Sequence, residues 1–215
     1  MDADFWHEKW ATGNIRFHQS QANPALVRHF EQLNLNPGDR IFLPLCGKTL
    51  DIDWLLSQGL QVAGAELSDV AIDQLFARLE LEPTITPVGK LLHYSAEKLD
   101  IFVGDIFDLT AEILGSVQAI YDRAALVAMP AEPRQQYAAH LLKLTNTAPQ
   151  LLITYEYDQS LMSGPPFSIP EQTVQQLYGA AYALQSLERR EVDGRLKEQA
   201  DAVESVWLLR NVSLA

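Results

Sequence analysis

A glutamate and a nearby loop stand at a spacing that suits the binding of a nucleoside. Glu66 ends the apolar run Gln61–Glu66 and follows Leu45, the last residue of an earlier apolar run, by 21 residues. In α/β sheets, a carboxylate at the end of the second strand can accept two hydrogen bonds from ribose hydroxyls. The spacing therefore favours a ribose ligand at Glu66, although by itself it leaves a chance match equally open.

The loop that follows the apolar run ending at Leu45 indicates which kind of nucleoside could bind. It reads Pro-Leu-Cys-Gly-Lys over 44–48, and Gly47 is the residue there that can turn the chain closely past a ligand. A dinucleotide site needs a glycine-rich turn whose N–H groups reach a pyrophosphate, and a P-loop needs Gly-x-x-x-x-Gly-Lys-Ser/Thr. The sequence has neither pattern, so a nucleoside without phosphates, such as S-adenosylmethionine, is favoured.

Polar residues also follow two later apolar runs. Asp105 could accept a hydrogen bond from an adenine amino group while Ile106 packs on the ring, and a cap on the following segment is an equally open interpretation. Asp122 and Arg123 leave the next run as a charged pair, which is costly to bury unless the charges are partnered. This pair indicates either a functional site or a structural salt bridge.

Apolar runs alternate with helix-like stretches, and this alternation predicts an α/β fold with a mostly parallel sheet. In such sheets, ligands bind beyond the carboxyl ends of the strands, where the polar residues above are found. We expect strands at Arg40–Leu45, Gln61–Glu66, Asp100–Val103, Ala119–Tyr121, Leu151–Tyr157, Leu184–Glu191 and Ala202–Arg210. We expect helices at Leu50–Ser57, at Val70–Leu79 with Ser68 or Asp69 as its cap, from near Pro130 to about Leu144, and at Pro170–Tyr178.

Length and composition exclude several classes of protein. The 215 residues, 47% of them hydrophobic, suit one domain, residues 1–215, and residues 1–35 are expected to form a helical cover in two pieces. The single cysteine, Cys46, excludes an internal disulfide and fits a reducing compartment. The net charge of −12 argues against nucleic-acid and anionic membrane partners. Without a signal peptide or an 18-residue apolar run, we expect a cytoplasmic monomer with no metal site.

Several longer motifs resemble the bacterial form of the thiopurine S-methyltransferase family, a class I family that uses S-adenosylmethionine. They occur in order over nearly the whole chain: FWHEKW (5–10), IRFHQ (15–19), LPLCGKTLD (43–51), AELS (65–68), GDIFDL (104–109), YDRAALVAM (121–129) and YDQSLMSGPPFSI (157–169). The resemblance implies a Rossmann-like fold with helices on both faces and a seven-stranded, mostly parallel sheet whose last strand is antiparallel. By analogy with other α/β sheets that carry an N-terminal appendage, the helical residues 1–35 are expected to form a lid over the cofactor site.

The resemblance also implies roles for individual residues. The implied cofactor contacts are Trp10, Leu45, Glu66, Asp105, Ile106 and Arg123. Phe17 would stack on the substrate ring, and Arg123 would lie between cofactor and substrate, as the catalytic residue that positions the substrate and acts on it electrostatically. A further substrate-side arginine of the family has only weak candidates here, namely Arg189, Arg190 and Arg195.

The resemblance implies S-methylation of small aromatic or heterocyclic thiols with S-adenosylmethionine as cofactor. An aromatic thiol is acidic enough to ionise near neutral pH, so the enzyme needs no protein nucleophile, and Cys46 is expected to pack in the core. The alternative is methylation of selenium or tellurium compounds in metalloid detoxification. A non-catalytic cofactor-binding module and a nucleotide-dependent oxidoreductase are further alternatives, and the glycine-poor loop argues against the oxidoreductase.

Overall fold

The computed structural model describes residues 3–15, 18–192 and 200–212, which form two compact units, residues 2–120 and residues 121–215. We call these the first and the second unit, and each is described by itself. The expectation of a single domain stays a prediction. No helix in the described part of the chain is long and apolar enough to cross a membrane.

The first unit is built on strands in the order β3-β4-β5-β2-β1-β6. The pairs β1–β2, β2–β5 and β1–β6 are parallel, whereas β3–β4 and β4–β5 are antiparallel. The bounds are β1 Arg40–Pro44, β2 Gln61–Glu66, β3 Thr84–Val88, β4 Leu91–Ala96, β5 Leu99–Val103 and β6 Ala119–Asp122, of which the last two residues belong to the second unit.

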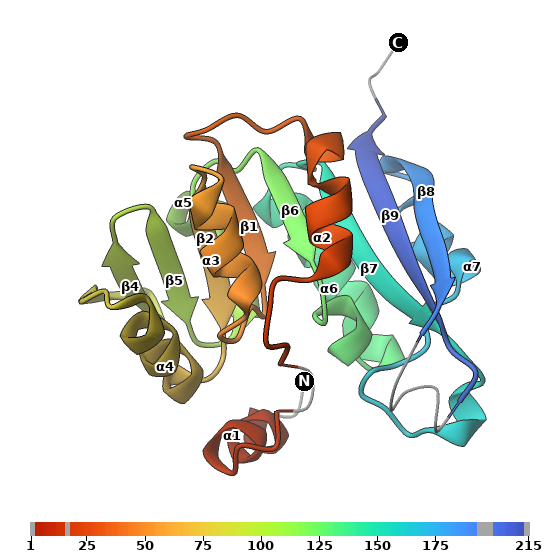
Figure 1. Ribbon diagram of the computed structural model, residues 1–215, viewed down its shortest axis with the longest axis horizontal. Coiled ribbons are helices and arrows are strands. Elements are labelled where there is room, and N and C mark those ends of the chain that lie inside the picture. Colours follow the sequence, from red (N-terminus) through yellow and green to blue (C-terminus); the bar gives the residue numbers. More distant parts are fainter. Residues whose placement is uncertain (1–2, 16–17, 193–199, 213–215) are drawn as a thin grey trace. The chain divides into compact units, whose positions relative to one another are not determined.

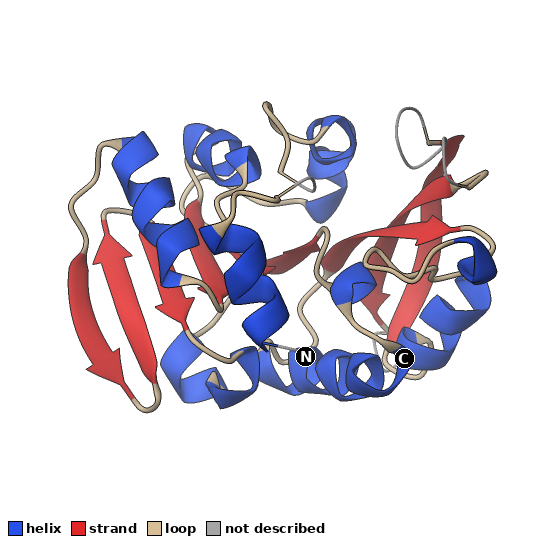
Figure 2. Ribbon diagram, turned by 90° about the horizontal axis from the view of Figure 1, so that it is seen from below, coloured by secondary structure: helices blue, strands red, loops and turns tan. Residues whose placement is uncertain are grey.

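Helices lie on both faces of these strands. In Figure 1, α3 and α4 lie in front of the central strands and α5 lies behind them, and Figure 2 shows the strands between the helices. The helical segments of the first unit are α1 Ala3–Ala11, α2 Pro24–His29, η1 Phe30–Leu33, α3 Leu50–Ser57, α4 Asp69–Leu79, η2 Ile106–Asp108 and α5 Ala111–Leu114. Residues 1–35 were expected to hold two helical pieces, and α1 and α2 with η1 confirm this.

Side-chain caps explain where several of these helices begin. Thr49 caps α3 by accepting a hydrogen bond from the Asp51 N–H, and Asn23 caps α2 with Pro24 at its first position. Of the two candidates for the cap of α4, the structure selects Ser68, whose hydroxyl accepts from the Ala71 N–H at 3.3 Å.

The second unit contains the strand order β7-β9-β8, and β9 is antiparallel to both of its neighbours. This confirms the antiparallel last strand. The strands are β7 Gln150–Glu156, β8 Tyr182–Glu191 and β9 Val203–Asn211, and the helical segments are η3 Leu126–Ala128, α6 Ala131–Leu144, η4 Gln159–Leu161 and α7 Glu171–Tyr178. Figure 1 draws α7 behind β8 and β9.

The expected strand count and the expected share of parallel pairs were wrong. The described residues contain nine strands instead of seven, and the strand pairing is mixed, because β3 and β4 form an additional antiparallel hairpin. A loop of two residues, 89–90, joins them, with Gly89 at φ 59°. Every residue of β3 except Val88 is exposed, so this strand lacks the apolar pattern by which the other strands were recognised.

A buried carboxylate organises the start of the second unit. Asp122 is fully buried at the end of β6, and it accepts hydrogen bonds from the Leu126 N–H at 3.0 Å and from the Tyr137 hydroxyl of α6 at 2.8 Å. Burial raises the pKa of Asp122 to about 6, although both hydrogen bonds act in the opposite direction. Asp122 is therefore a structural anchor for the turn that follows β6.

This shift predicts how stability depends on pH. The folded-state pKa of about 6 lies above the value of about 3.9 for an unfolded aspartate. The contribution of Asp122 to the unfolding free energy is therefore fully present below the unfolded-state pKa and is lost as the pH rises through the folded-state pKa. Relative to Asp122→Asn, which cannot titrate, the wild-type protein should lose about 1–2 kcal/mol of unfolding free energy between pH 5 and pH 8. Denaturant unfolding at several pH values measures this difference, and parallel curves would contradict the assignment.

Candidate active site

The carboxylate of Glu66 joins two loops at the carboxyl ends of neighbouring strands. Its Oε2 atom accepts a hydrogen bond from the Gly47 N–H at 2.8 Å, and its Oε1 atom accepts one from the Ser68 N–H at 3.0 Å. The Gly47 loop follows β1, and Ser68 opens α4. Since β1 pairs with β2 on one side and β6 on the other, this is the switch point where open α/β sheets bind ligands.

Glu66 is only 6% exposed, and its environment sets its charge state. Burial raises the pKa of the Glu66 carboxyl above its ordinary value, whereas the backbone hydrogen bonds and the charge of His7 act to lower it. The two carboxylate oxygens together have about four lone pairs, and backbone N–H groups of Gly47, Ser68 and Leu67 act on them. The group therefore retains acceptor capacity for a hydroxyl of a ligand.

Trp10 of α1 packs directly on the Gly47 loop. The Trp10 side chain is 5% exposed, and a Cβ atom added to Gly47 would lie 2.8 Å from its Cζ2 atom. Gly47 also has φ 51°, so both space and backbone conformation require glycine here. Leu45 has φ 47°, which is uncommon outside glycine, and its side chain is half-buried. The first unit thus brings together Trp10, Leu45 and Glu66.

Asp105 and Ile106 follow β5, the strand next to β2. The Gly104 N–H donates to the backbone oxygen of Glu66 at 2.9 Å, so the two strand ends are joined. Asp105 is exposed and its Oδ1 atom accepts from the Phe107 N–H at 3.0 Å, which confirms the cap expected as one of its two roles. Ile106 is 1% exposed and packs in the core. Their contacts with an adenine ring stay predictions.

The donor and acceptor groups of the first unit fit S-adenosylmethionine. Glu66 offers carboxylate oxygens to a diol, Gly47 permits close approach of the backbone, and Trp10 supplies an apolar wall.

Within the described residues, no group of three or more His, Cys, Asp or Glu side chains could hold a metal ion. The Cys46 thiol is 8% exposed, and burial raises its pKa well above the ordinary value, as expected for a packing residue.

Arg123 belongs to the second unit, in the turn that Asp122 holds. The turn runs from 123 to 126, and the Leu126 N–H is bound to the Asp122 carboxylate. Ala124 lies at φ 64° within it, so the backbone is held in an uncommon conformation beside Arg123. The Arg123 side chain is half-buried. The hydrogen bonds from Leu126 in the turn and from Tyr137 in α6 explain how the Asp122 carboxyl can be buried at the end of β6.

The loop after β7 packs against the segment that follows this turn. The Phe167 N–H donates to the Val127 oxygen at 2.6 Å, and Arg134 lies over the Phe167 ring at 6.0 Å. The Tyr157 hydroxyl donates to the Pro166 oxygen at 2.6 Å. The Gly-Pro-Pro-Phe loop, residues 164–167, is therefore held by hydrogen bonds at Pro166 and Phe167. Residues 161–165, which include the first two residues of this loop, line a cavity of about 510 Å³.

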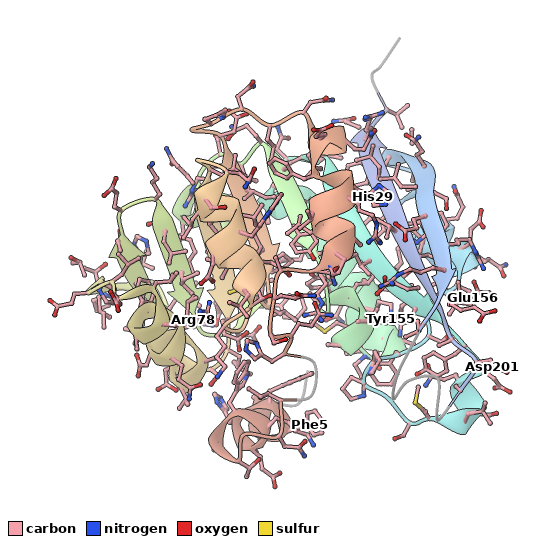
Figure 3. All side chains as sticks on the ribbon, in the orientation of Figure 1. Phe5, His29, Arg78, Tyr155, Glu156 and Asp201 are labelled. Carbon is pink, nitrogen blue, oxygen red and sulfur yellow. The ribbon has the colours of Figure 1, made fainter. Side chains whose placement is uncertain are left out.

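A row of polar side chains across β7, β9 and β8 was not predicted from the sequence. Tyr155 lies opposite Glu204, and Glu204 lies opposite Arg190. Glu204 is 4% exposed, accepts from Arg190 Nη2 at 2.8 Å and is hydrogen-bonded to the Tyr155 hydroxyl. Burial raises the pKa of Tyr155 to about 12, and the Arg123 charge acts to lower it. Figure 3 labels Tyr155 on β7.

The weak arginine candidates have structural partners where the structure describes them. Arg190 binds Glu204, and Arg189 binds Glu156 at 3.0 Å. Arg195 and Phe17 lie outside the described residues, so their expected roles stay predictions. The row on β7, β9 and β8 could not be found from the sequence, because its members are brought together by strand register alone.

Sequence comparison places the chain within one family over nearly its whole length. The family model described as thiopurine S-methyltransferase matches residues 1–211. Thiopurine S-methyltransferases of Xanthobacter autotrophicus and Teredinibacter turnerae are each 54% identical to the chain, over 97% and 99% of it and over 99% and 100% of their own lengths. The Pseudomonas aeruginosa enzyme is 45% identical over 90% of the chain and 89% of its own length.

Two solved structures with a similar fold are methyltransferases of low sequence identity to this chain. A methyltransferase from Anabaena variabilis that depends on S-adenosylmethionine has a TM-score of 0.63 at 14% identity and covers 97% of this chain and 95% of its own. A Burkholderia thailandensis N1-methyltransferase with bound S-adenosylhomocysteine has a TM-score of 0.64 at 14% identity, over 97% of this chain and 86% of its own. These likenesses support the class I fold. From the family match and the identity of its relatives, the chain belongs to the thiopurine S-methyltransferase family and uses S-adenosylmethionine as its methyl donor.

Proposed function

We propose that this protein methylates the sulfur of small aromatic or heterocyclic thiols. The observation that carries the cofactor half of this proposal is the buried Glu66 carboxylate, which the Gly47 and Ser68 N–H groups hold at the switch point of the sheet. The thiol acceptor is supported by the family match and by the cationic Arg123 at the end of β6.

On the cofactor side, Glu66 binds the ribose hydroxyls. Trp10 and Leu45 pack around the cofactor, and α1 covers it as part of an N-terminal lid. Asp105 and Ile106 flank the adenine. This assignment is supported by the contact between Trp10 and the Gly47 loop and by the bond between the ends of β2 and the Gly104 turn.

On the acceptor side, Arg123 favours the anionic form of the thiol and orients it, and Phe17 stacks on its ring. When bound, S-adenosylmethionine supplies an electrophilic methyl group on a cationic sulfonium. The acceptor thiol would lose its proton to water, Arg123 would hold the resulting thiolate toward the methyl group, and S-adenosylhomocysteine would be the leaving group. The protein contributes alignment, water exclusion and electrostatic stabilisation of the thiolate.

A product screen with methyl-labelled S-adenosylmethionine tests this function. The panel contains aromatic thiols, heterocyclic thiols, aliphatic thiols, and oxidised and reduced selenium and tellurium compounds, and the products are identified by mass spectrometry. Labelled methyl thioethers from the aromatic and heterocyclic thiols are expected. Labelled product from the selenium or tellurium compounds alone would replace the proposal with the metalloid alternative.

Removal of the Glu66 carboxylate should weaken cofactor binding. Glu66→Ala should lower the affinity for S-adenosylhomocysteine by roughly 1–3 kcal/mol, because hydrogen bonds to a charged acceptor are lost. Calorimetric titration measures the affinity, and Glu112→Ala, which removes an exposed carboxylate from α5, is the control. Equal affinity of a folded Glu66→Ala protein and the wild type would remove Glu66 from the site.

Substitution of Arg123 should lower turnover more than it lowers cofactor affinity. Arg123→Lys keeps the charge but loses the planar fork and should retain part of the activity, whereas Arg123→Ala should retain much less. If Arg123 stabilises the thiolate, the Ala variant should suffer most below the pKa of the acceptor and recover partly above it. The pH profile of kcat/KM for the three proteins tests this. A loss that is independent of pH and follows the melting temperature would leave Arg123 with a structural role.

A further inference from the structure

Arg78 connects α4 to the loop that carries Gly47. Its Nη1 atom donates to the Lys48 backbone oxygen at 2.6 Å, and its Nη2 atom donates to the Thr49 backbone oxygen at 3.3 Å. The same guanidinium pairs with both carboxylate oxygens of Asp53 on α3, at 2.5 and 3.2 Å. Figure 3 labels Arg78 on the side of α4 that faces α3. One side chain thus binds the end of the loop and the helix that follows it.

Other contacts show that α4 supports both parts of the ribose-binding region. At its start, the Ser68 N–H binds the Glu66 carboxylate. Further along, Gln74 accepts a hydrogen bond from Lys48 Nζ at 2.6 Å, one turn before Arg78. A single helix therefore holds the carboxylate at one end and the loop at the other.

The loop needs such support, because its backbone is held in uncommon conformations. Leu45 and Gly47 both have positive φ, at 47° and 51°. A non-glycine residue in this region is sterically costly, and such a conformation persists only where the surroundings fix it. The loop must also present the Gly47 N–H to Glu66, and a shift of the Lys48 and Thr49 carbonyls would move that donor.

An ion pair alone would not explain the position of Arg78. The guanidinium lies against the first turn of α3, where the helix dipole disfavours a positive charge, and the Asp53 carboxylate offsets that effect. The planar Arg78 guanidinium supplies two donors that point at two successive backbone carbonyls, those of Lys48 and Thr49. A lysine cannot supply two donors in this geometry.

We propose that Arg78 is a positioning residue for the cofactor, which sets the affinity for S-adenosylmethionine by holding the 45–49 loop against Glu66. This inference rests on the proposed role of Glu66 in binding the ribose. Arg78 acts through the loop backbone, since its partners are the Lys48 and Thr49 oxygens and Asp53.

A matched pair of arginines separates this role from general stabilisation. Arg40 also pairs with a carboxylate, Asp100 at 3.0 Å, and also donates to a backbone oxygen, that of Leu114. Its side chain is similarly sheltered, but it stands at the first residue of β1, at the opposite end of the strand from the Gly47 loop. Arg40→Ala therefore removes a comparable set of contacts away from the cofactor region.

The experiment compares Arg78→Ala, Arg78→Lys, Asp53→Asn and Arg40→Ala with the wild type. We measure the Kd for S-adenosylhomocysteine by calorimetry, the KM values for S-adenosylmethionine and for the acceptor thiol, and the melting temperature. Arg78→Ala should raise the cofactor Kd and KM about tenfold, as expected for the loss of one well-placed charged hydrogen bond. The KM for the thiol should stay unchanged. Arg78→Lys and Asp53→Asn should give smaller increases, and Arg40→Ala should lower the melting temperature without changing the cofactor Kd.

Amide hydrogen exchange supplies a second measurement that does not depend on activity. Exchange of the peptide spanning 45–49 should accelerate in the Arg78 variants and not in Arg40→Ala. An unchanged cofactor Kd in Arg78→Lys and Asp53→Asn together with unchanged exchange of that peptide would overturn the proposal, as would equal effects of Arg78→Ala and Arg40→Ala on the Kd. A wild-type protein that binds no S-adenosylhomocysteine would instead contradict the proposed function itself.

Discussion

The candidate site depends on one buried carboxylate that accepts hydrogen bonds from two loops. Glu66 receives the Gly47 N–H from the loop after β1 and the Ser68 N–H from the start of α4. Burial makes the charge costly, and the two backbone donors offset part of that cost. The same bonds fix both loops at the strand ends, so the groups proposed to contact a nucleoside are held in place in advance.

Asp122, the buried carboxylate of the second unit, holds the turn that follows β6. Asp122 accepts its hydrogen bonds from Leu126 and Tyr137, within the turn after β6 and from α6, and so fixes the backbone beside Arg123. The Tyr155 hydroxyl, which is hydrogen-bonded to the paired Glu204 carboxylate, lies within the electrostatic influence of Arg123. In both units, a carboxylate near the carboxyl end of a strand holds the loop backbone on which a predicted site residue depends.

Sequence patterns predicted the parts of this structure that local chemistry determines. The apolar runs predicted β1, β2 and β5–β9 to within a few residues, and the 21-residue spacing after Leu45 selected Glu66. The hydrogen bond from the Gly47 N–H to that carboxylate is a finding of the structure. The β3–β4 hairpin was missed because β3 is almost wholly exposed. Arg78 and the row from Tyr155 to Arg190 were missed because helix packing and strand register, which short-range patterns do not encode, create their contacts.

The structure of the complex with S-adenosylhomocysteine tests the central claim most directly, because the claim concerns where a ribose is bound. The account predicts both ribose hydroxyl oxygens within about 2.6–3.2 Å of the Glu66 carboxylate oxygens, a hydrogen-bonding distance. The Gly47 and Ser68 N–H groups should remain bound to the same carboxylate, and Trp10 should lie beside the ligand. A ribose bound away from Glu66, with the carboxylate contacting backbone N–H groups alone, would contradict it.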